Sequence, residues 1–232
     1  MLELNGKPII CHMIDRLKSS SMLDRIIICT SANPQDRPLV DIARNENIDY
    51  YLGSEEDVIL RLYEAAKKFK LDYVLNVTAD CPLVSLEYLE EIVNKYIETN
   101  ADFIRCLDLP IGLAPYGLKI EAMRKVCEIK RSEETEVWGR YFTDSGLFSI
   151  VNIDIPLEYI RPDYRLTLDY PEDFKFFQNL FEHFGEDTCK TPMPDIIKYL
   201  DETPEVVKIN KHCQELYRER WESQGRLTRW NI

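Results

Sequence analysis

The stretch DYVLNVTADCPL, residues 72–83, decides the fold. Its first six residues are mostly apolar and predict a short buried β-strand. Asp80 therefore stands just beyond the carboxyl end of a strand, where open α/β sheets bind their ligands. The alternative is that Asp80 caps the next helix, but Ser85 and Glu87 already supply that helix with a cap and an acidic first turn. A functional role is favoured for Asp80.

Two similar runs precede this stretch, at residues 25–30 and 49–52, and segments of helical periodicity separate them. We expect helices at residues 8–18 and from Ser54, as N-cap, to Phe69. This alternation predicts an α/β fold with a mostly parallel sheet and helices on both faces.

The second half of the chain is less regular and predicts a mixed sheet. Prolines and glycines punctuate residues 110–117, as in loops that bind substrates. Strands are expected at residues 116–120 and 146–150, and helices at residues 171–184 and 210–223. The last helix carries an apolar stripe: Cys213, Leu216, Tyr217 and Trp221. We therefore divide the chain into an α/β domain, residues 1–209, and a C-terminal amphipathic helix and tail, residues 210–232.

Composition narrows the class of protein. The 232 residues carry a net charge of −12, so we expect no binding to nucleic acid or to anionic membranes. Seven scattered cysteines predict neither a disulfide framework nor a zinc ribbon, and the three histidines show no metal-ligand spacing. Neither a leader peptide nor a run of about 18 apolar residues is evident, so we expect a cytoplasmic protein.

Asp169 is the second candidate acid. It follows a strand-like triplet in RLTLDYPEDF, residues 165–174, and directly precedes a helix. Local sequence leaves two interpretations equally open, a ligand-binding acid or the N-cap of that helix. Carboxylates from two strand ends suit Mg²⁺, which takes one or two protein oxygens and completes its shell with water and substrate phosphates. Asp80 and Asp169 together therefore form a candidate magnesium site.

Four motifs, in order along the chain, resemble a known family. They are LNGKPII at residues 4–10, GSEEDV at residues 53–58 followed by Arg61, TADCPL at residues 78–83 and LDYPED at residues 168–173. Together they resemble the cytidylyltransferases that activate acidic sugars, among them those for 3-deoxy-manno-octulosonate and acylneuraminate. The similarity is greatest to the spore-coat polysaccharide biosynthesis protein F group.

The resemblance implies a Rossmann-like nucleotide-diphospho-sugar transferase fold and a magnesium-dependent enzyme. It would transfer CMP from CTP to an acidic sugar or sugar phosphate for surface polysaccharide or glycan synthesis. Asp80 and Asp169 would be the catalytic metal ligands, and a homodimer is possible. The candidate substrate-binding residues are Gly53, Ser54, Arg61, Tyr116, Gly117, Arg140 and Arg165.

Two departures from the family pattern matter. Relatives begin with a strand and an Arg/Lys-containing loop that cradles the triphosphate, whereas Met1 stands almost directly before Gly6. We expect the first strand and the triphosphate cradle to be absent. Either the start codon was assigned too late or the chain is a truncated product. The late start is favoured, because the rest of the family pattern is intact. Residues 134–142 also depart from the family pattern, which predicts a different acceptor. Arg140, Arg161 and Arg165 could each pair with an acceptor carboxylate or phosphate, although isolated arginines are more often structural or solvated.

Two other functions stay open. The first is a non-catalytic domain that keeps the sugar-nucleotide fold and binds a ligand or partner, which the missing cradle favours. The second is a glycosyltransferase of similar fold, which would need an acidic motif such as Asp-x-Asp that the sequence lacks.

Overall fold

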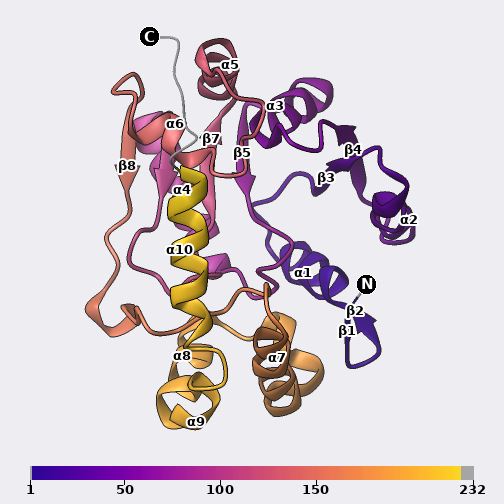
Figure 1. Cartoon of the computed structure of the whole chain (residues 1–232), viewed down its shortest axis with the longest axis vertical. Coiled ribbons are helices and arrows are strands. Elements are labelled where there is room, and N and C mark those ends of the chain that lie inside the picture. The colour runs from indigo at the N-terminus through magenta and orange to yellow at the C-terminus, as the bar shows by residue number, and fades with distance from the viewer. Residues whose placement is uncertain (1, 226–232) are drawn as a thin grey trace.

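The computed structural model describes residues 2–225, with the backbone alone described for residues 220–225. Helices surround the strands, as expected for an α/β fold (Figure 1). The strands are β1 (Glu3–Leu4), β2 (Lys7–Pro8), β3 (Ile27–Ser31), β4 (Asp49–Gly53), β5 (Tyr73–Asn76), β6 (Phe103–Arg105), β7 (Tyr116–Lys119) and β8 (Ile150–Asn152). The three strands predicted in the first half are confirmed as β3, β4 and β5, because their runs of apolar residues fit a buried sheet.

The α-helices fill the connections between the strands and form most of the C-terminal third. They are α1 (Ile9–Lys18), α2 (Arg37–Asn45), α3 (Val58–Phe69), α4 (Leu86–Thr99), α5 (Ile120–Ile129), α6 (Gly139–Thr143), α7 (Pro171–Phe184), α8 (Met193–Glu202), α9 (Pro204–Val207) and α10 (Cys213–Gly225). Short 3₁₀ turns lie at Pro34–Asp36, Leu157–Tyr159 and Gly185–Lys190. The largest apolar core gathers around α7 and α8 and reaches β6.

The largest sheet is mixed and has the strand order β5-β7-β6-β8. Strand β7 runs antiparallel to both β5 and β6, whereas β8 is parallel to β6. Fewer of the strand pairs are parallel than the sequence predicted. The reason is local: a loop without a helix connects β6 to β7, and parallel neighbours need a long crossover connection.

The sheet is interrupted between β3 and β5. Strand β3 pairs with β4 in parallel, β5 pairs with β7, and no other described strand borders either one. A cavity of about 730 Å³ lies between them and is lined by residues such as Ile28, Val74 and Leu75. The resemblance implied a missing first strand, and the described residues leave this space without one.

Helix α1 bridges the interruption. Met13 and Leu17 pack in a cluster that includes Leu75 of β5, while Ile10 and Ile14 pack in a cluster that includes Ile28 of β3. One face of a single amphipathic helix therefore connects the two parts of the sheet.

Three local predictions need correction. The N-cap of α3 is Asp57, whose carboxylate accepts from Leu60 N–H at 3.2 Å, and not Ser54. The strand expected at residues 146–150 begins only at Ile150, because Gly146 has a φ of +69° and Ser149 N–H donates to the Asp102 carboxylate instead of to a neighbouring strand. The expected helix at residues 210–223 begins at Cys213 instead.

The stripe predicted on the last helix is only partly buried. Cys213 is buried and Tyr217 is half-buried, but Leu216 is 48% exposed. The side chain of Trp221 lies outside the described residues.

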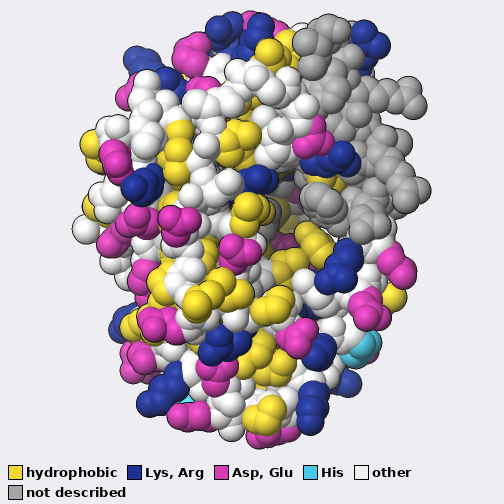
Figure 2. Space-filling model, turned by 90° about the vertical axis from the view of Figure 1, so that its left-hand side faces the viewer, with side chains coloured by type: hydrophobic (Ala, Val, Ile, Leu, Met, Phe, Trp, Pro, Cys, Tyr) yellow, Lys and Arg dark blue, Asp and Glu magenta, His cyan; other side chains and the backbone are white. Residues whose placement is uncertain are grey.

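Charged side chains of both signs lie on the surface, and the cysteines form no disulfides among the described residues. Figure 2 shows one face on which lysine and arginine side chains are interspersed with acidic ones. All seven cysteines are free, four of them buried. Among the described helices, none combines the length and the apolar character that a membrane crossing requires.

Candidate active site

Asp80 and Asp169 lie on two segments that touch. Leu168 N–H donates a hydrogen bond to the carbonyl oxygen of Asp80 at 2.9 Å, which joins the turn after β5 to the segment before α7. Burial raises the pKa of Asp169 above its usual value, the hydrogen bond from Arg165 opposes this shift, and the charge of Asp80 adds to it. The charge of Asp80 therefore acts on Asp169, although residues 166–168 form no strand and only Arg165 makes an isolated bridge, with Ile111, so the strand expected before Asp169 is absent from the described residues.

Arg165 holds Asp169 in place. Its Nη2 donates to Asp169 Oδ2 at 2.5 Å, and its Nε and Nη2 donate to the two carboxylate oxygens of Asp173 at 2.9 and 3.0 Å. The side chains of Arg165 and Asp173 are fully buried, whereas that of Asp169 keeps 17% of its surface exposed. The guanidinium therefore neutralises two acids and leaves one of them accessible.

Asp173, and not Asp169, satisfies the start of α7. Its carboxylate accepts from the backbone N–H groups of Asp169 and Tyr170 at 2.9 and 3.0 Å, and Tyr170 is the N-cap residue. This excludes the capping alternative for Asp169. Ser85 likewise caps α4 by accepting from Tyr88 N–H at 3.3 Å, which leaves the Asp80 side chain without a capping role.

A distant residue completes the network around Arg165. Asn210 Nδ2 donates to Asp173 Oδ1 at 2.8 Å and to the carbonyl oxygen of Arg165 at 3.0 Å. Arg165 Nη1, by contrast, is buried without a hydrogen-bond partner among the described residues. A buried donor on a charged group is costly to leave unpaired, so Nη1 is an exception within this network.

Helix α10 closes over this network. The Tyr170 and Tyr217 rings lie 5.3 and 5.1 Å from the guanidinium carbon of Arg165. Burial, and then the nearby Tyr116 and Asp169, raise the pKa of Tyr217 to about 12. The C-terminal helix, which Figure 1 shows lying across the front of the molecule, therefore contributes to the candidate site.

Tyr116 and Gly117 of β7 have different surroundings. Burial raises the pKa of Tyr116, and Cys81, next to Asp80, adds to the shift, which places Tyr116 beside the candidate acids. A Cβ at Gly117 would lie 2.0 Å from the Tyr73 hydroxyl and 2.4 Å from Ile92. Gly117 is therefore required for packing.

Gly53, Ser54 and Arg61 form a local unit at the end of β4. Arg61 Nη1 donates to the carbonyl oxygens of Ser54 at 2.5 Å and Glu55 at 3.0 Å. Because a Cβ at Gly53 would lie 2.8 Å from Arg61 Cγ, only glycine lets the arginine side chain lie against the strand. Arg61 thus orders this loop, and its role in substrate binding stays a prediction.

The other two arginines form ion pairs near the surface. Arg140 Nε pairs with Asp144 at 2.7 Å on α6, and Arg161 pairs with Asp201 at the end of α8. Their roles toward an acceptor also stay predictions.

Sequence reasoning missed Asp173, Asn210 and Tyr217 as parts of the site. Asp173 lies inside the quoted motif at residues 168–173, so a signal was present. Asn210 and Tyr217 are separated from Arg165 by more than 40 residues, and local sequence carries no signal for such contacts.

Comparisons with known proteins identify the family of the chain. A family model described as cytidylyltransferase matches residues 1–211. An uncharacterized protein of Methanocaldococcus jannaschii is 29% identical over 222 residues, which span 94% of this chain and 90% of that protein. The spore coat polysaccharide biosynthesis protein SpsF of Bacillus subtilis is 23% identical over 181 residues, 75% of each chain.

A solved cytidylyltransferase from Leptospira borgpetersenii has the same fold. Its TM-score to this chain is 0.81 at 22% sequence identity, with 89% of this chain and 88% of the other covered. The fold is therefore that of the nucleotide-diphospho-sugar transferases.

Proposed function

The chain belongs to the cytidylyltransferase family, and from that membership we propose that it transfers CMP from CTP to an acidic sugar or sugar phosphate for surface polysaccharide or glycan synthesis. The observation that supports the proposal most is the hydrogen bond from Leu168 N–H to the carbonyl oxygen of Asp80, which joins the two segments that carry Asp80 and Asp169. A sugar hydroxyl, or the phosphate of a sugar phosphate, attacks the α-phosphorus of CTP, and pyrophosphate leaves.

Asp80 and Asp169 fit a magnesium ion. They supply two oxygen ligands, and the charge of Asp80 raises the pKa of Asp169, a repulsion that a bound divalent cation would relieve. Mg²⁺ uses such carboxylates together with water and substrate phosphates. When bound, it would neutralise the negative charge of the triphosphate.

The residues of the chain would act by positioning and by charge. Arg165 fixes the Asp169 carboxylate, and its unpaired Nη1 is suited to donate to a phosphate oxygen of the substrate. Arg140 and Arg161 would pair with the acidic acceptor by exchanging their present partners, Asp144 and Asp201. Because no covalent intermediate is needed, positioning and electrostatic stabilisation account for catalysis.

The interruption of the sheet favours a second candidate function. The described residues include no strand and no Arg/Lys loop between β3 and β5, where the cavity lies. Without a loop that cradles the triphosphate, the domain would bind a nucleotide or a sugar but would not catalyse the transfer of CMP.

The test is a comparison of Asp80→Asn with the unaltered chain. We expect pyrophosphate release from CTP and acidic sugars to fall by on the order of 100-fold or more, the scale of losing one group that stabilises transition-state charge. The fold should persist, because the Asp80 carboxylate accepts one described hydrogen bond, from the thiol of Cys81 at 3.4 Å. Asp41→Asn, at a surface acid of α2, is the control and should retain full activity.

Thermal shift separates the two candidate functions. A Mg²⁺-dependent rise in Tm that is selective for CTP, and lost in Asp80→Asn, would support the transferase site. A nucleotide-induced shift without any turnover would support the binding domain. Full activity of Asp80→Asn would contradict the assignment of the metal ligand.

A further inference from the structure

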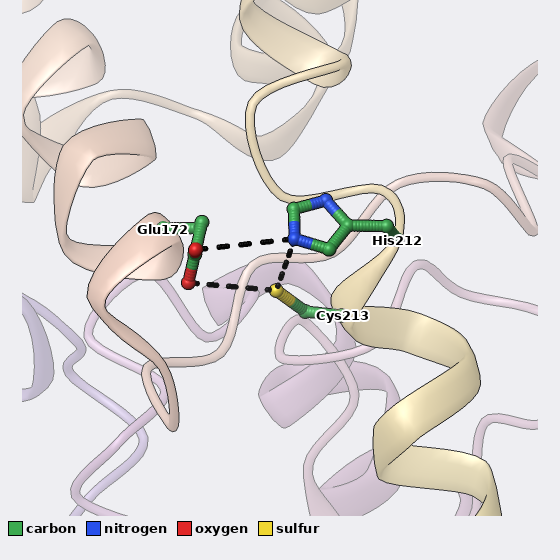
Figure 3. A group of neighbouring side chains, drawn as sticks. All are labelled: Glu172, His212 and Cys213. Carbon is green, nitrogen blue, oxygen red and sulfur yellow. Dashed lines mark hydrogen bonds and ion pairs between the residues drawn. The ribbon is translucent and has the colours of Figure 1, made fainter.

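Three side chains of different chemistry meet where α10 begins. Glu172 lies in the first turn of α7, His212 directly precedes α10, and Cys213 is its first residue. Figure 3 shows the three side chains converging on one point from these two elements. His212 Nε2 lies 4.0 Å from Glu172 Oε1, and Cys213 Sγ lies 3.7 Å from His212 Nε2 and 4.0 Å from Glu172 Oε2.

These separations are somewhat longer than those between the ligands of one tetrahedral ion. Zinc bonds are about 2.3 Å to sulfur and about 2.0–2.2 Å to nitrogen and oxygen, so ligand atoms around it stand about 3.3–3.6 Å apart. The separation of 3.7 Å between Cys213 Sγ and His212 Nε2 is close to these values, whereas the two separations of 4.0 Å end on different oxygens of Glu172, and the three ligand atoms lie within 4.8 Å of one another. Small side-chain rotations would close the difference.

Direct contacts among the three residues satisfy them poorly. A thiol is a weak donor, and separations of 3.7 and 4.0 Å lie at the outer limit of a sulfur hydrogen bond. The histidine–carboxylate separation of 4.0 Å is likewise at the limit of an ion pair. The three groups surround a point without bonding strongly to one another, which is the arrangement that a small cation would fill.

The base of the group is held rigidly, and its outer side is open. Asn210, two residues before His212, is anchored to the fully buried Asp173, one residue after Glu172, by a hydrogen bond of 2.8 Å. Cys213 is 1% exposed, whereas the side chain of His212 is 60% exposed. The site is therefore preorganised, and solvent can reach a fourth ligand position.

We propose that Glu172, His212 and Cys213 bind Zn²⁺, with water as the fourth ligand. The mixed sulfur, nitrogen and oxygen set suits this borderline-soft ion and excludes Mg²⁺, which takes oxygen ligands. The site is distinct from Asp80 and Asp169. Its ligands come from α7 and from the start of α10, so zinc would tie the C-terminal helix to the segment that carries Asp169.

Cobalt(II) titration of the full chain tests the proposal, because tetrahedral cobalt bound to a thiolate absorbs visibly. After removal of metal with EDTA, we expect one equivalent of Co²⁺ to give a sulfur-to-metal charge-transfer band that Zn²⁺ abolishes and excess Mg²⁺ does not. Cys213→Ser should lose the band. Cys127→Ser, at a half-buried cysteine on α5, is the matched control and should keep it.

Glu172→Gln keeps the test decisive if Cys213→Ser fails to fold. The Glu172 side chain is 40% exposed, so the substitution should preserve the structure and weaken zinc binding by at least about tenfold in calorimetry. A wild-type chain without the charge-transfer band, or equal zinc affinities of wild type and Glu172→Gln, would overturn the proposal. These readouts need neither CTP nor turnover, so they are independent of the proposed transferase activity.

Discussion

At the scale of the residue, Arg165 links the stability of the chain to its chemistry. Its guanidinium is fully buried and is shared between Asp169, which faces the candidate site, and Asp173, which satisfies the start of α7. A planar guanidinium can bond both acids at once, whereas an ammonium group cannot reproduce that geometry. The same residue is therefore expected to affect folding and activity together.

Arg165→Met should lower the free energy of unfolding by about 3–5 kcal/mol, because it leaves two buried or half-buried carboxylates without their cation. Urea denaturation measures this loss. Arg44→Met removes an exposed pair with Asp41 and should change stability by at most about 1 kcal/mol. Equal losses in the two variants would contradict the role of Arg165.

Only those residues of the candidate site whose place along the sequence indicates a function could be predicted from the sequence. Asp80 was chosen because it follows the strand β5, whereas the strand-like triplet before Asp169 forms no strand, and the roles of both acids stay predictions. Asn210 and Tyr217 could not be found, since they meet Arg165 only after the chain has folded. The zinc ligands were missed for the same reason, because Glu172 lies 41 residues from Cys213.

At the scale of the element, predictions succeeded where a segment has clear ends. The strands of the first half agree within two residues, because polar or small residues bound their apolar runs. Helix α5 was missed because it follows β7 directly, without a capping side chain at Lys119. Helix α8 was also missed: Pro194 stands in its first turn, where proline is tolerated, although prolines usually signal a break.

One contact between elements predicts a dependence on pH. Arg161 donates to both oxygens of Asp201, at the end of α8, at 2.8 Å, and Tyr164 donates to Oδ1 at 2.5 Å. The bond from Arg161, and then that from Tyr164, hold the pKa of Asp201 below its ordinary value of 3.8. The stabilisation is therefore fully present above about pH 4 and is lost as the pH falls through the lower pKa of the folded state.

Asp201→Asn should consequently be less stable than wild type by about 0.5 kcal/mol near neutral pH, a small value because both side chains are about one-third exposed. Urea denaturation across a pH series should show this difference shrinking below about pH 4. Asp187→Asn, at an acid that is 81% exposed, should differ little from wild type throughout. A deficit of Asp201→Asn that stays constant with pH would refute the assignment.

At the scale of the whole molecule, the interruption between β3 and β5 is the main departure from a continuous sheet. Within residues 2–225, each of these strands pairs on one side only, whereas β6 and β7 are paired on both sides. Successive N–H groups of a strand point to opposite edges, so alternate amides of β3 and β5 point into the cavity.

Hydrogen exchange measured by NMR should reveal this asymmetry. We expect alternate amides of β5 to exchange at least about tenfold faster than those of β7, because they lack a partner strand. Strand β7 serves as the internal control, since it belongs to the same sheet. Uniform protection along β5 would show that its second edge is paired in solution.

The unpaired edges of β3 and β5 also affect the tendency of the newly made chain to aggregate. Unpaired strand edges act as templates for other chains, and here they border an apolar cavity instead of being shielded by charge. Before folding is complete, the edges of β3 and β5 would be exposed, and the new chain would be prone to aggregate, because partly folded chains associate through such edges. The yield of folded protein in a cell should therefore depend on chaperones that bind these two strand edges until folding is complete.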